Sequence, residues 1–286
     1  MKLSIVTINY NNAEGLRKTL ASVTAQTYRD IEHVIVDAAS TDGSVDIIKE
    51  YADNADYPVS WSSKKDKGIY NGMNIGIKRA AGDYIQILNS GDMLAVPDVT
   101  ERMIDTLSTL NIKHSTENVS ILYGNMLKSY DGKTIINRDT CGGRMYTPES
   151  FLYFYKGTLN HDCAYIRRDL FEKYGLYNEQ MKICSDWEWY VRAIVLGGEE
   201  PVYTNIDVTI FDMNGVSESY GKNAELIKRE RREYLESILP PAVLHDYDMF
   251  SFPITQYQRL KKYHLWGIVN FIERVLFKLE KWHILR

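Results

Sequence analysis

Four polar stretches in the first hundred residues carry side chains that can bind cations and phosphates, and each follows an apolar run of strand length. They read NYNN (9–12), DAASTDGS (37–44), KKDKGIYNGMN (64–74) and NSGD (89–92). Carboxylates and amides are hard oxygen ligands for Mg²⁺ or Mn²⁺, lysines neutralise phosphate charge, and glycine lets a backbone approach closely. These residue types indicate recognition of a nucleotide diphosphate with a divalent ion.

The apolar runs and the segments between them predict how these stretches are positioned. Strands are expected at 3–8, 33–37, 58–63 and 83–88, with helices at 13–26, 44–52 and 69–81. This alternation predicts an α/β fold with a mostly parallel sheet and helices on both faces. Because ligands bind such sheets at the carboxyl ends of the strands, the four stretches should meet at one edge.

The second half of the chain has a looser pattern. We expect a helix at 99–110, strands at 119–124, 163–168, 202–205 and 208–211, a helix starting near Asp186, and a charged helix at 222–237. The predicted domains are 1–217, divided into halves 1–124 and 125–217, and a C-terminal helical extension at 218–286.

Composition excludes several classes of protein. The 286 residues are 44 % hydrophobic and 25 % charged, and the net charge of -4 argues against a nucleic-acid partner. The three cysteines form no CxxC pair, so neither a structural zinc site nor a disulfide framework is expected. No run reaches the roughly 18 apolar residues of a spanning helix, and no leader pattern is present. A cytoplasmic location is therefore expected.

Four motifs occur in a fixed order: SIVTINYNN, VDAASTDGS, DKGIYNGMNIGIKRAAGDYIQILNSGD and ICSDWEWYVRA. Together they resemble the inverting family-two glycosyltransferases, above all bacterial enzymes that build capsule, O-antigen and colanic-acid-type polysaccharides. The resemblance covers about 1–217 and implies a GT-A fold, with a Rossmann-like sheet flanked by helices. It implies transfer of a sugar from a nucleotide-sugar donor, usually UDP-linked, to a saccharide or lipid-linked oligosaccharide acceptor, with inversion at the anomeric carbon.

The resemblance also assigns roles to matching residues. Asp186 in SDWEW matches the general base, and Asp92 matches the ligand of the divalent ion, Mg²⁺ or Mn²⁺. The donor site is assigned Thr7, Asn9, Asp37, Asp66, Lys67, Asn89, Ser90 and Gly91. The acceptor site is assigned His161, Trp187 and Glu188. The NGVS stretch, 214–217, resembles a loop that closes over the donor diphosphate.

Several of these residues have structural alternatives. Asp92 can be a turn residue, and Asp186 can cap a helix or place a favourable charge in its first turn. His161 can be a core histidine, Trp187 can pack in the core, and Glu188 can be an ordinary first-turn glutamate. The chemistry nevertheless suits Asp186, because an acceptor hydroxyl becomes nucleophilic when a positioned carboxylate takes its proton.

One departure from the family pattern concerns the metal loop. Many members carry Asp-x-Asp, whereas NSGD leaves Asp92 as the one ionisable ligand, so the diphosphate and water are expected to complete the coordination. The alternative is a catalytically impaired, glycosyltransferase-like protein that binds nucleotides or acts as a scaffold. A dinucleotide-dependent oxidoreductase is disfavoured, because the first strand runs into NYNN and not into GxGxxG.

The C-terminal segment, 255–286, is basic in an acidic protein, with seven Lys or Arg against two Glu. Apolar residues recur at helical spacing, which predicts a basic amphipathic helix at about 258–283: Leu265, Ile268, Ile272, Leu276 and Leu279. Such a helix can lie on the inner leaflet of a membrane and be attracted by anionic lipids. The alternative is that it packs on the catalytic domain or on another subunit of an oligomer.

Overall fold

The computed structural model describes residues 1–113, 118–139, 150–213 and 220–281, and the NGVS stretch lies outside them. The chain divides into two compact units, Met1–Tyr234 and Leu235–Arg286. The predicted domain boundary at 217 also lies outside the described residues, and the first unit continues into the helix that follows it. That boundary therefore remains a prediction.

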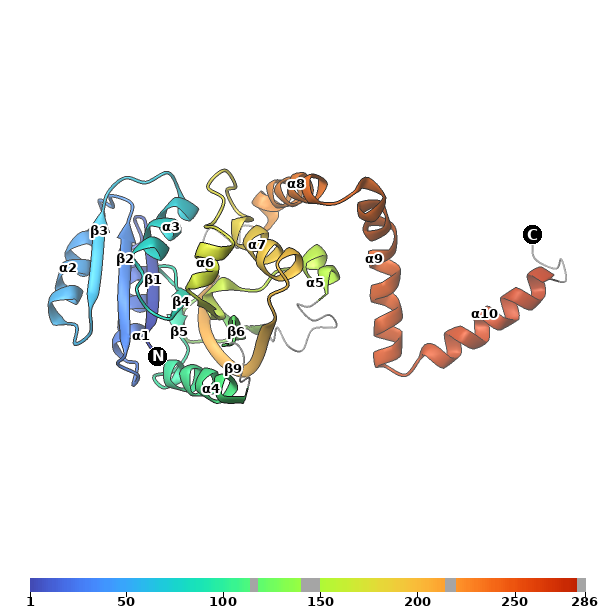
Figure 1. The fold of residues 1–286 in the computed structure, drawn as a ribbon, viewed down its shortest axis with the longest axis horizontal. Coiled ribbons are helices and arrows are strands. Elements are labelled where there is room, and N and C mark those ends of the chain that lie inside the picture. Colours follow the sequence, from blue (N-terminus) through green and yellow to red (C-terminus); the bar gives the residue numbers. More distant parts are fainter. Residues whose placement is uncertain (114–117, 140–149, 214–219, 282–286) are drawn as a thin grey trace. The chain divides into compact units, whose positions relative to one another are not determined.

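The first unit is built on one sheet, which holds nine strands within the described residues, in the order β3-β2-β1-β4-β8-β6-β9-β5 with β7 pairing to β6 (Figure 1). The strands are β1 (Leu3–Asn9), β2 (Ile31–Asp37), β3 (Val59–Ser63), β4 (Tyr84–Ile87), β5 (Met93–Leu94), β6 (Ile121–Ser129), β7 (Asn137–Asp139), β8 (Ala164–Arg167) and β9 (Pro201–Asp212). The first four strands are parallel, as predicted.

Beyond β4 the sheet is mixed, because β8 runs antiparallel to both β4 and β6. Strand β9 then runs parallel to β6, and β5 runs antiparallel to β9. The start of β8, the end of β9 and the start of β5 therefore lie at the same edge as the ends of β1, β2 and β4. This edge collects loops from both halves of the chain.

Helices cover both faces of the parallel half. The helices of the first unit are α1 (Ala13–Thr24), α2 (Ser44–Asn54), α3 (Ile69–Arg79), α4 (Val99–Lys113), α5 (Phe151–Lys156), α6 (Asp169–Lys173), α7 (Ser185–Tyr190) and most of α8 (Tyr220–Ile238). A 3₁₀ turn η2 (His161–Cys163) precedes β8, and a π-helical segment η3 (Val191–Leu196) continues α7.

The two faces are distinguished by neighbouring residues of β2. Ile35 packs with apolar residues of α1 and α2. Val34, one residue earlier and so on the opposite face, is paired with Val6 of β1, which contacts Gly76 of α3. Helices α1 and α2 thus cover one face and α3 covers the other, as the alternating pattern predicts.

The prediction of separate strands at 202–205 and 208–211 was wrong, because β9 is continuous across both. Polar residues between the two apolar runs suggested a break. In the structure their side chains have partners on the neighbouring strand, since the Asn125 amide donates to Oδ1 of Asn205 at 3.1 Å and of Asp207 at 3.0 Å. The pairing of β6 with β9 is irregular around Asn125, and this irregularity absorbs the polar residues without ending the strand.

The second unit consists of the end of α8, α9 (Pro241–Lys262) and α10 (Trp266–Lys281). Among the described residues, no helix combines the length and apolar character needed to cross a bilayer. Helix α10 covers the second part of the predicted amphipathic segment 258–283, whereas residues 258–262 form the end of α9 and the two helices are separate.

The close approach of α3 to β1 gives a test of the fold. A Cβ built on Gly76 would lie 2.3 Å from Cγ1 of the fully buried Val6, whereas one built on Gly267 of α10 has no neighbour within 4 Å. We expect Gly76→Val to lower the free energy of unfolding by about 2 kcal/mol through overpacking. The matched control Gly267→Val should change it little. Urea denaturation followed by circular dichroism measures both, and equal effects would contradict the close contact.

Candidate functional site

The edge described above brings together most of the polar residues that the sequence pointed to. Asn9 and Asp37 end β1 and β2, and Asn89 to Asp92 connect β4 to β5. His161 lies in the turn that leads into β8. Asp186 reaches the same place from α7, through a contact with His161.

Asp37 is buried, and its carboxylate accepts hydrogen bonds from nearby residues of the protein. Its Oδ1 accepts hydrogen bonds from the Asn9 amide at 2.8 Å and the Ser40 hydroxyl at 2.5 Å, and its Oδ2 accepts from the Ser40 N–H at 2.9 Å and the Ser63 hydroxyl at 2.6 Å. Burial opposes ionisation, but these hydrogen bonds hold the pKa of Asp37 below its ordinary value. Asp37 therefore fixes the loop after β2, and its contact with a nucleobase remains a prediction.

Thr7 supports the metal loop from beneath. Its side chain is fully buried, and its hydroxyl donates to the Leu88 carbonyl oxygen at 2.8 Å, one residue before Asn89. Because that bond uses the hydroxyl's single hydrogen, the Nε2–H of His33, 2.9 Å away, donates to it in turn. Burial lowers the pKa of His33 to about 3, so the ring is neutral. The Thr7 side chain therefore supports this loop and is not exposed at the sheet edge, and its predicted contact with the donor has no exposed atom to make it.

Asp66 and Lys67 lie in the loop that leads from β3 to α3, and β3 ends at the same edge of the sheet as β2. Asp66 Oδ1 accepts the Gly68 N–H at 2.9 Å, and the Lys67 side chain is exposed. This hydrogen bond holds the turn into α3. Their predicted contact with the nucleoside remains a prediction.

The NSGD loop is anchored to α1. Thr19 accepts the Gly91 N–H at 2.9 Å and donates to the Asp92 carbonyl oxygen at 2.7 Å, while the Asn12 amide donates to the Ser90 carbonyl oxygen at 2.9 Å. Gly91 has φ +111°, a conformation that favours glycine. Backbone geometry thus directs Asp92 toward the sheet edge.

Asp92 has two acidic neighbours that the sequence reasoning missed, Asp162 and Asp212. Its Oδ1 accepts the Asp212 N–H at 3.0 Å, and a Cβ built on Gly91 would lie 3.4 Å from Asp212 Oδ2. Asp92 is only 5 % exposed, and burial together with the negative charge of Asp162 raises its pKa well above the ordinary value. Asp162 is itself buried and accepts the Thr209 hydroxyl at 2.9 Å.

His161 connects the metal loop to Asp186. Its Nδ1 lies 3.2 Å from Asp186 Oδ2, and its Nε2 lies 3.1 Å from the Asn89 amide. Burial opposes protonation, but the hydrogen bond and charge of Asp186 raise the pKa of His161 to about 9. The atom of Asn89 that faces Nε2 is the amide nitrogen Nδ2, so a ring that carries a proton on both nitrogens requires this amide to turn its oxygen toward Nε2. That orientation gives Asn89 Oδ1, otherwise without a partner, a donor.

Asp186 is the one residue of α7 that is not buried, and its side chain keeps 15 % exposure. Burial opposes its ionisation, yet the hydrogen bond and positive charge of His161 keep the pKa of Asp186 below its ordinary value. The Tyr70 hydroxyl lies 3.2 Å from its Oδ1. Asp186 is therefore an ionised carboxylate that keeps some exposure to solvent.

Trp187 and Glu188 occupy supporting positions in α7, which differs from the predicted contact with the acceptor. Trp187 is 1 % exposed and donates from Nε1 to the Phe154 carbonyl oxygen at 2.7 Å. Glu188 is 4 % exposed and accepts two hydrogen bonds of 3.0 Å from Arg192. Since packing and pairing occupy both side chains, they hold the helix that carries Asp186.

The donor set of this edge fits a divalent cation. Four carboxylates, those of Asp92, Asp162, Asp186 and Asp212, interact here, and His161 is the cation that interacts with both Asp92 and Asp186. The ligands are hard oxygens, as Mg²⁺ and Mn²⁺ prefer. Within the described part of the chain no three His, Cys, Asp or Glu residues form a ready cage. Diphosphate oxygens would therefore have to complete the coordination.

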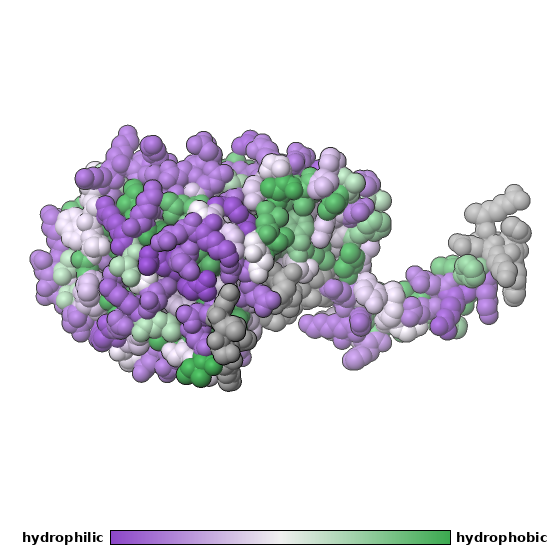
Figure 2. All heavy atoms as spheres, in the orientation of Figure 1, coloured by the Kyte–Doolittle hydropathy of each residue, from purple (hydrophilic) through white to green (hydrophobic). Residues whose placement is uncertain are grey.

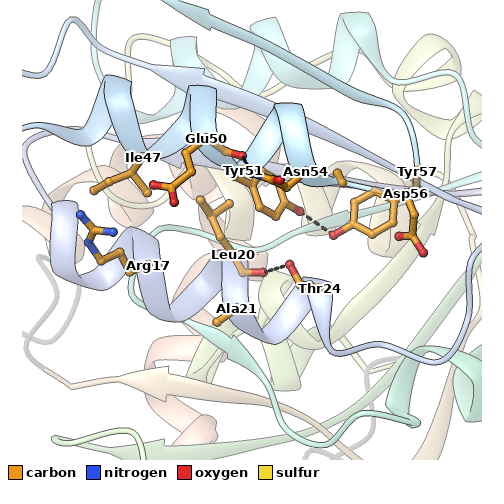
Figure 3. A pocket seen from close by; sticks show the side chains of 11 residues that line it. Arg17, Leu20, Ala21, Thr24, Ile47, Glu50, Tyr51, Asn54, Asp56 and Tyr57 are labelled. Carbon is orange, nitrogen blue, oxygen red and sulfur yellow. Dashed lines mark hydrogen bonds between the residues drawn. The ribbon is translucent and has the colours of Figure 1, made fainter.

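A pocket of about 370 Å³ lies elsewhere, between the C-terminal halves of α1 and α2 and the segment that leads to β3 (Figure 3). The hydroxyls of Tyr51 and Tyr57 point toward each other there, 2.7 Å apart. None of the predicted site residues lines this pocket. Both helices run away from the edge that holds Asp92, so the pocket lies toward the opposite edge of the sheet.

Comparison with known proteins identifies curated relatives of similar length. The chain is 31 % identical over 217 residues to an uncharacterized glycosyltransferase of Mycobacterium tuberculosis, covering 75 % of this chain and 76 % of the relative. It is 27 % identical over 228 residues to a PGL/p-HBAD biosynthesis glycosyltransferase of Mycobacterium bovis, covering 79 % and 82 %.

Two solved structures share the fold. The structure of S. aureus TarS 1-349 in complex with UDP-GlcNAc has a TM-score of 0.58 at 19 % identity, covering 74 % of this chain and 58 % of that one. The mannosyltransferase PcManGT from Pyrobaculum calidifontis, in complex with GDP-Man and Mn²⁺, has a TM-score of 0.56 at 17 % identity, covering 74 % and 56 %. This chain spans less than two thirds of either solved chain, and the likeness confirms the GT-A fold.

The family assignment follows from the sequence itself. The profile of glycosyl transferase family 2 matches residues 4–175, which include all four polar stretches at the ends of the parallel strands. With this match and the relative at 31 % identity, the chain belongs to glycosyl transferase family 2.

Proposed function

We propose that this protein transfers a sugar from a UDP-sugar to a hydroxyl of a saccharide or lipid-linked oligosaccharide, with inversion at the anomeric carbon, in cell-surface polysaccharide synthesis. The observation that carries the proposal is the convergence of Asp92, His161 and Asp186 at one sheet edge. The complexes of neighbouring folds with UDP-GlcNAc and with GDP-Man and Mn²⁺ support a nucleotide-sugar donor.

The state of Asp186 supports its role as the general base. As the acceptor oxygen bonds to the anomeric carbon, the hydroxyl proton passes to Asp186, and the nucleoside diphosphate leaves from the opposite face of the sugar. His161 holds the carboxylate in place from Nδ1 and so orients it. An inverting single displacement needs no further nucleophile.

Asp92 and Asp212 are the residues that we assign to a divalent ion, Mg²⁺ or Mn²⁺. When bound, such an ion offsets the negative charge that develops on the diphosphate. Asp92 brings little charge of its own while its pKa is raised, so ion and donor should bind together. A loop that supplies a single carboxylate is consistent with such joint binding of ion and donor.

A donor screen tests the proposal. We expect one class among UDP-, GDP- and dTDP-sugars to raise the melting temperature with Mn²⁺ but not with EDTA, because ligands of the native state stabilise it. Asp92→Asn should remove the Mn²⁺-dependent part of the shift. The control Asp46→Asn changes an 85 % exposed carboxylate of α2 and should keep it.

Two outcomes of this screen would contradict the proposal. Equal UDP affinity of wild type and Asp92→Asn in the presence of Mn²⁺, measured by calorimetry, would remove Asp92 from the metal site. Nucleotide binding without turnover of any donor would favour the alternative of a nucleotide-binding scaffold.

Replacing the base should separate binding from chemistry. We expect Asp186→Asn to lower kcat of sugar transfer by about 10³-fold, because the amide cannot accept the hydroxyl proton. The affinity for UDP with Mn²⁺ should stay within about twofold, since Asp186 is assigned to the acceptor and to the chemical step and not to nucleotide binding. Steady-state kinetics with the donor found above and calorimetry measure the two quantities. Unchanged kcat would refute the assignment.

We also propose that α10 binds the inner leaflet of the membrane. Its apolar residues recur at helical spacing and remain exposed: Ile268 at 59 %, Phe271 at 67 %, Ile272 at 50 %, Val275 at 40 % and Leu276 at 43 %. Hydrophobic and hydrophilic residues are both visible along this part of the chain in Figure 2. The segment is basic, so anionic lipid complements both its charge and its apolar side.

Vesicle sedimentation with the full chain tests this proposal. We expect binding to phosphatidylcholine vesicles that contain phosphatidylglycerol, weaker binding without it, and loss of binding in salt. Phe271→Ser should weaken binding about tenfold, because burial of one such side chain is worth ~1.5–3 kcal/mol. The control Ile112→Ser changes an 82 % exposed residue of α4 and should have no effect.

The rival explanation makes a different prediction. A chain that forms a stable dimer in gel filtration and ignores vesicles, with Phe271→Ser dissociating the dimer, would show that a second copy covers α10. A monomer that ignores vesicles would show that α10 packs on its own chain.

A further inference from the structure

Glu230 of α8 makes an unusual set of contacts with the segment that precedes α7. Its carboxylate accepts three consecutive backbone N–H groups, from Lys182 at 2.7 Å and from Ile183 and Cys184 at 3.1 Å. The side chain is only 7 % exposed. Successive N–H groups that point to one place form an anion-binding nest, and here the chain's own carboxylate fills it.

The nest lies immediately before α7, the helix that carries Asp186. Cys184 is the last residue before α7, and Asp186 is the second residue within it. Three amides of one short loop are therefore fixed to a residue 46 positions or more along the chain. The direction in which α7 begins, and with it the direction of Asp186, depends on this loop.

Other residues of α8 contact Trp187, the residue that follows Asp186 in the sequence. The Arg231 guanidinium lies 5.0 Å from the centre of the Trp187 ring, and the Tyr234 ring meets the same indole edge to face at 5.7 Å. Figure 1 shows α8 beside α7. Helix α8 thus holds residues on both sides of Asp186, by hydrogen bonds before it and by packing after it.

A tyrosine of α3 binds a backbone carbonyl group of the same loop. The Tyr70 hydroxyl lies 2.5 Å from the Ile183 carbonyl oxygen and 3.2 Å from Asp186 Oδ1. The peptide group between Ile183 and Cys184 is therefore fixed through its N–H by Glu230 and through its C=O by Tyr70. Loss of one of these contacts would let the peptide plane turn and move Asp186 relative to His161.

We propose that Glu230 is a positioning residue that aims Asp186 at the acceptor hydroxyl. The proposal rests on Asp186 acting as the base. Its effect on rate follows from geometry, since misplacing a reacting group by about 1 Å can cost ~100-fold in rate. Glu230 itself needs no contact with substrate.

The first test needs no substrate. Glu230→Gln keeps the shape of the side chain but turns an N–H₂ group toward three N–H donors, so at most one oxygen can accept. Two-dimensional NMR of the histidine rings reports the contact of His161 with Asp186, and Asp186→Asn defines the signal when this contact is lost. We expect Glu230→Gln to move the His161 ring signal toward its position in Asp186→Asn. Hydrogen exchange of the backbone amides at 182–184 should also become faster.

The second test separates positioning from folding. We expect Glu230→Gln to lower kcat of transfer about 10–100-fold, while KM for the donor and UDP affinity with Mn²⁺ stay within about twofold. Glu230→Asp, which keeps the charge, should recover part of the rate. The control Glu233→Gln removes an exposed partner of Arg229 on the same helix and should have no effect.

Each outcome bears on Glu230 separately from the proposed function. A moved His161 signal with unchanged kcat would refute the positioning role, and an unmoved signal would refute the link to Asp186. A parallel fall of kcat, UDP affinity and melting temperature would show a general structural role and overturn the proposal. If no donor supports transfer by the wild type, the sugar-transfer function fails, while the His161 signal still decides whether Glu230 sets the position of Asp186.

Discussion

The cost of burying negative charge at one sheet edge constrains the rest of this site. Asp92, Asp162 and Asp186 are each taken largely out of water, and Asp212 lies beside them. A carboxylate in such a place is stable when it is protonated, paired with a cationic side chain or bound to a metal ion. Asp186 is paired with His161 and stays ionised, whereas Asp92 and Asp162 resist ionisation. One imidazole therefore divides the site into an ionised carboxylate, Asp186, and a pair that resists ionisation unless a cation is near, Asp92 and Asp162.

The parallel half of this arrangement could be predicted because its rules are local. A carboxylate directly after a short apolar run, as at Asp37 and Asp92, lies at the carboxyl end of a strand, and parallel strands end together. Asp162 and Asp212 escaped prediction because their place depends on the direction of β8 and β9. Asp212 ends a strand as plainly as Asp37 does, so the signal existed, but nothing local shows which edge that strand approaches.

Side-chain roles were harder to predict than positions. Trp187 and Glu188 lie next to Asp186 in the sequence, yet in a helix adjacent residues face different directions. Asp186 turns outward while Trp187 and Glu188 turn into the core. Thr7 likewise belongs to the first motif, but nearly all of β1 is buried, and the Thr7 hydroxyl donates to the Leu88 carbonyl oxygen. The contribution of Glu230 has no local signature, because its partners are backbone groups of a distant loop.

The neutral side chain of Asn89 in the NSGD loop fits the way in which the positive charge of His161 is shared among the nearby carboxylates. A carboxylate at this position would face His161 Nε2 and compete with Asp186 for the imidazolium. It would also add a further negative charge near Asp92, whose pKa burial and Asp162 already raise. An amide at this position carries no charge and so leaves the positive charge of the ring to Asp186. The loop thereby has one carboxylate fewer, and Asp186, the proposed base, stays ionised.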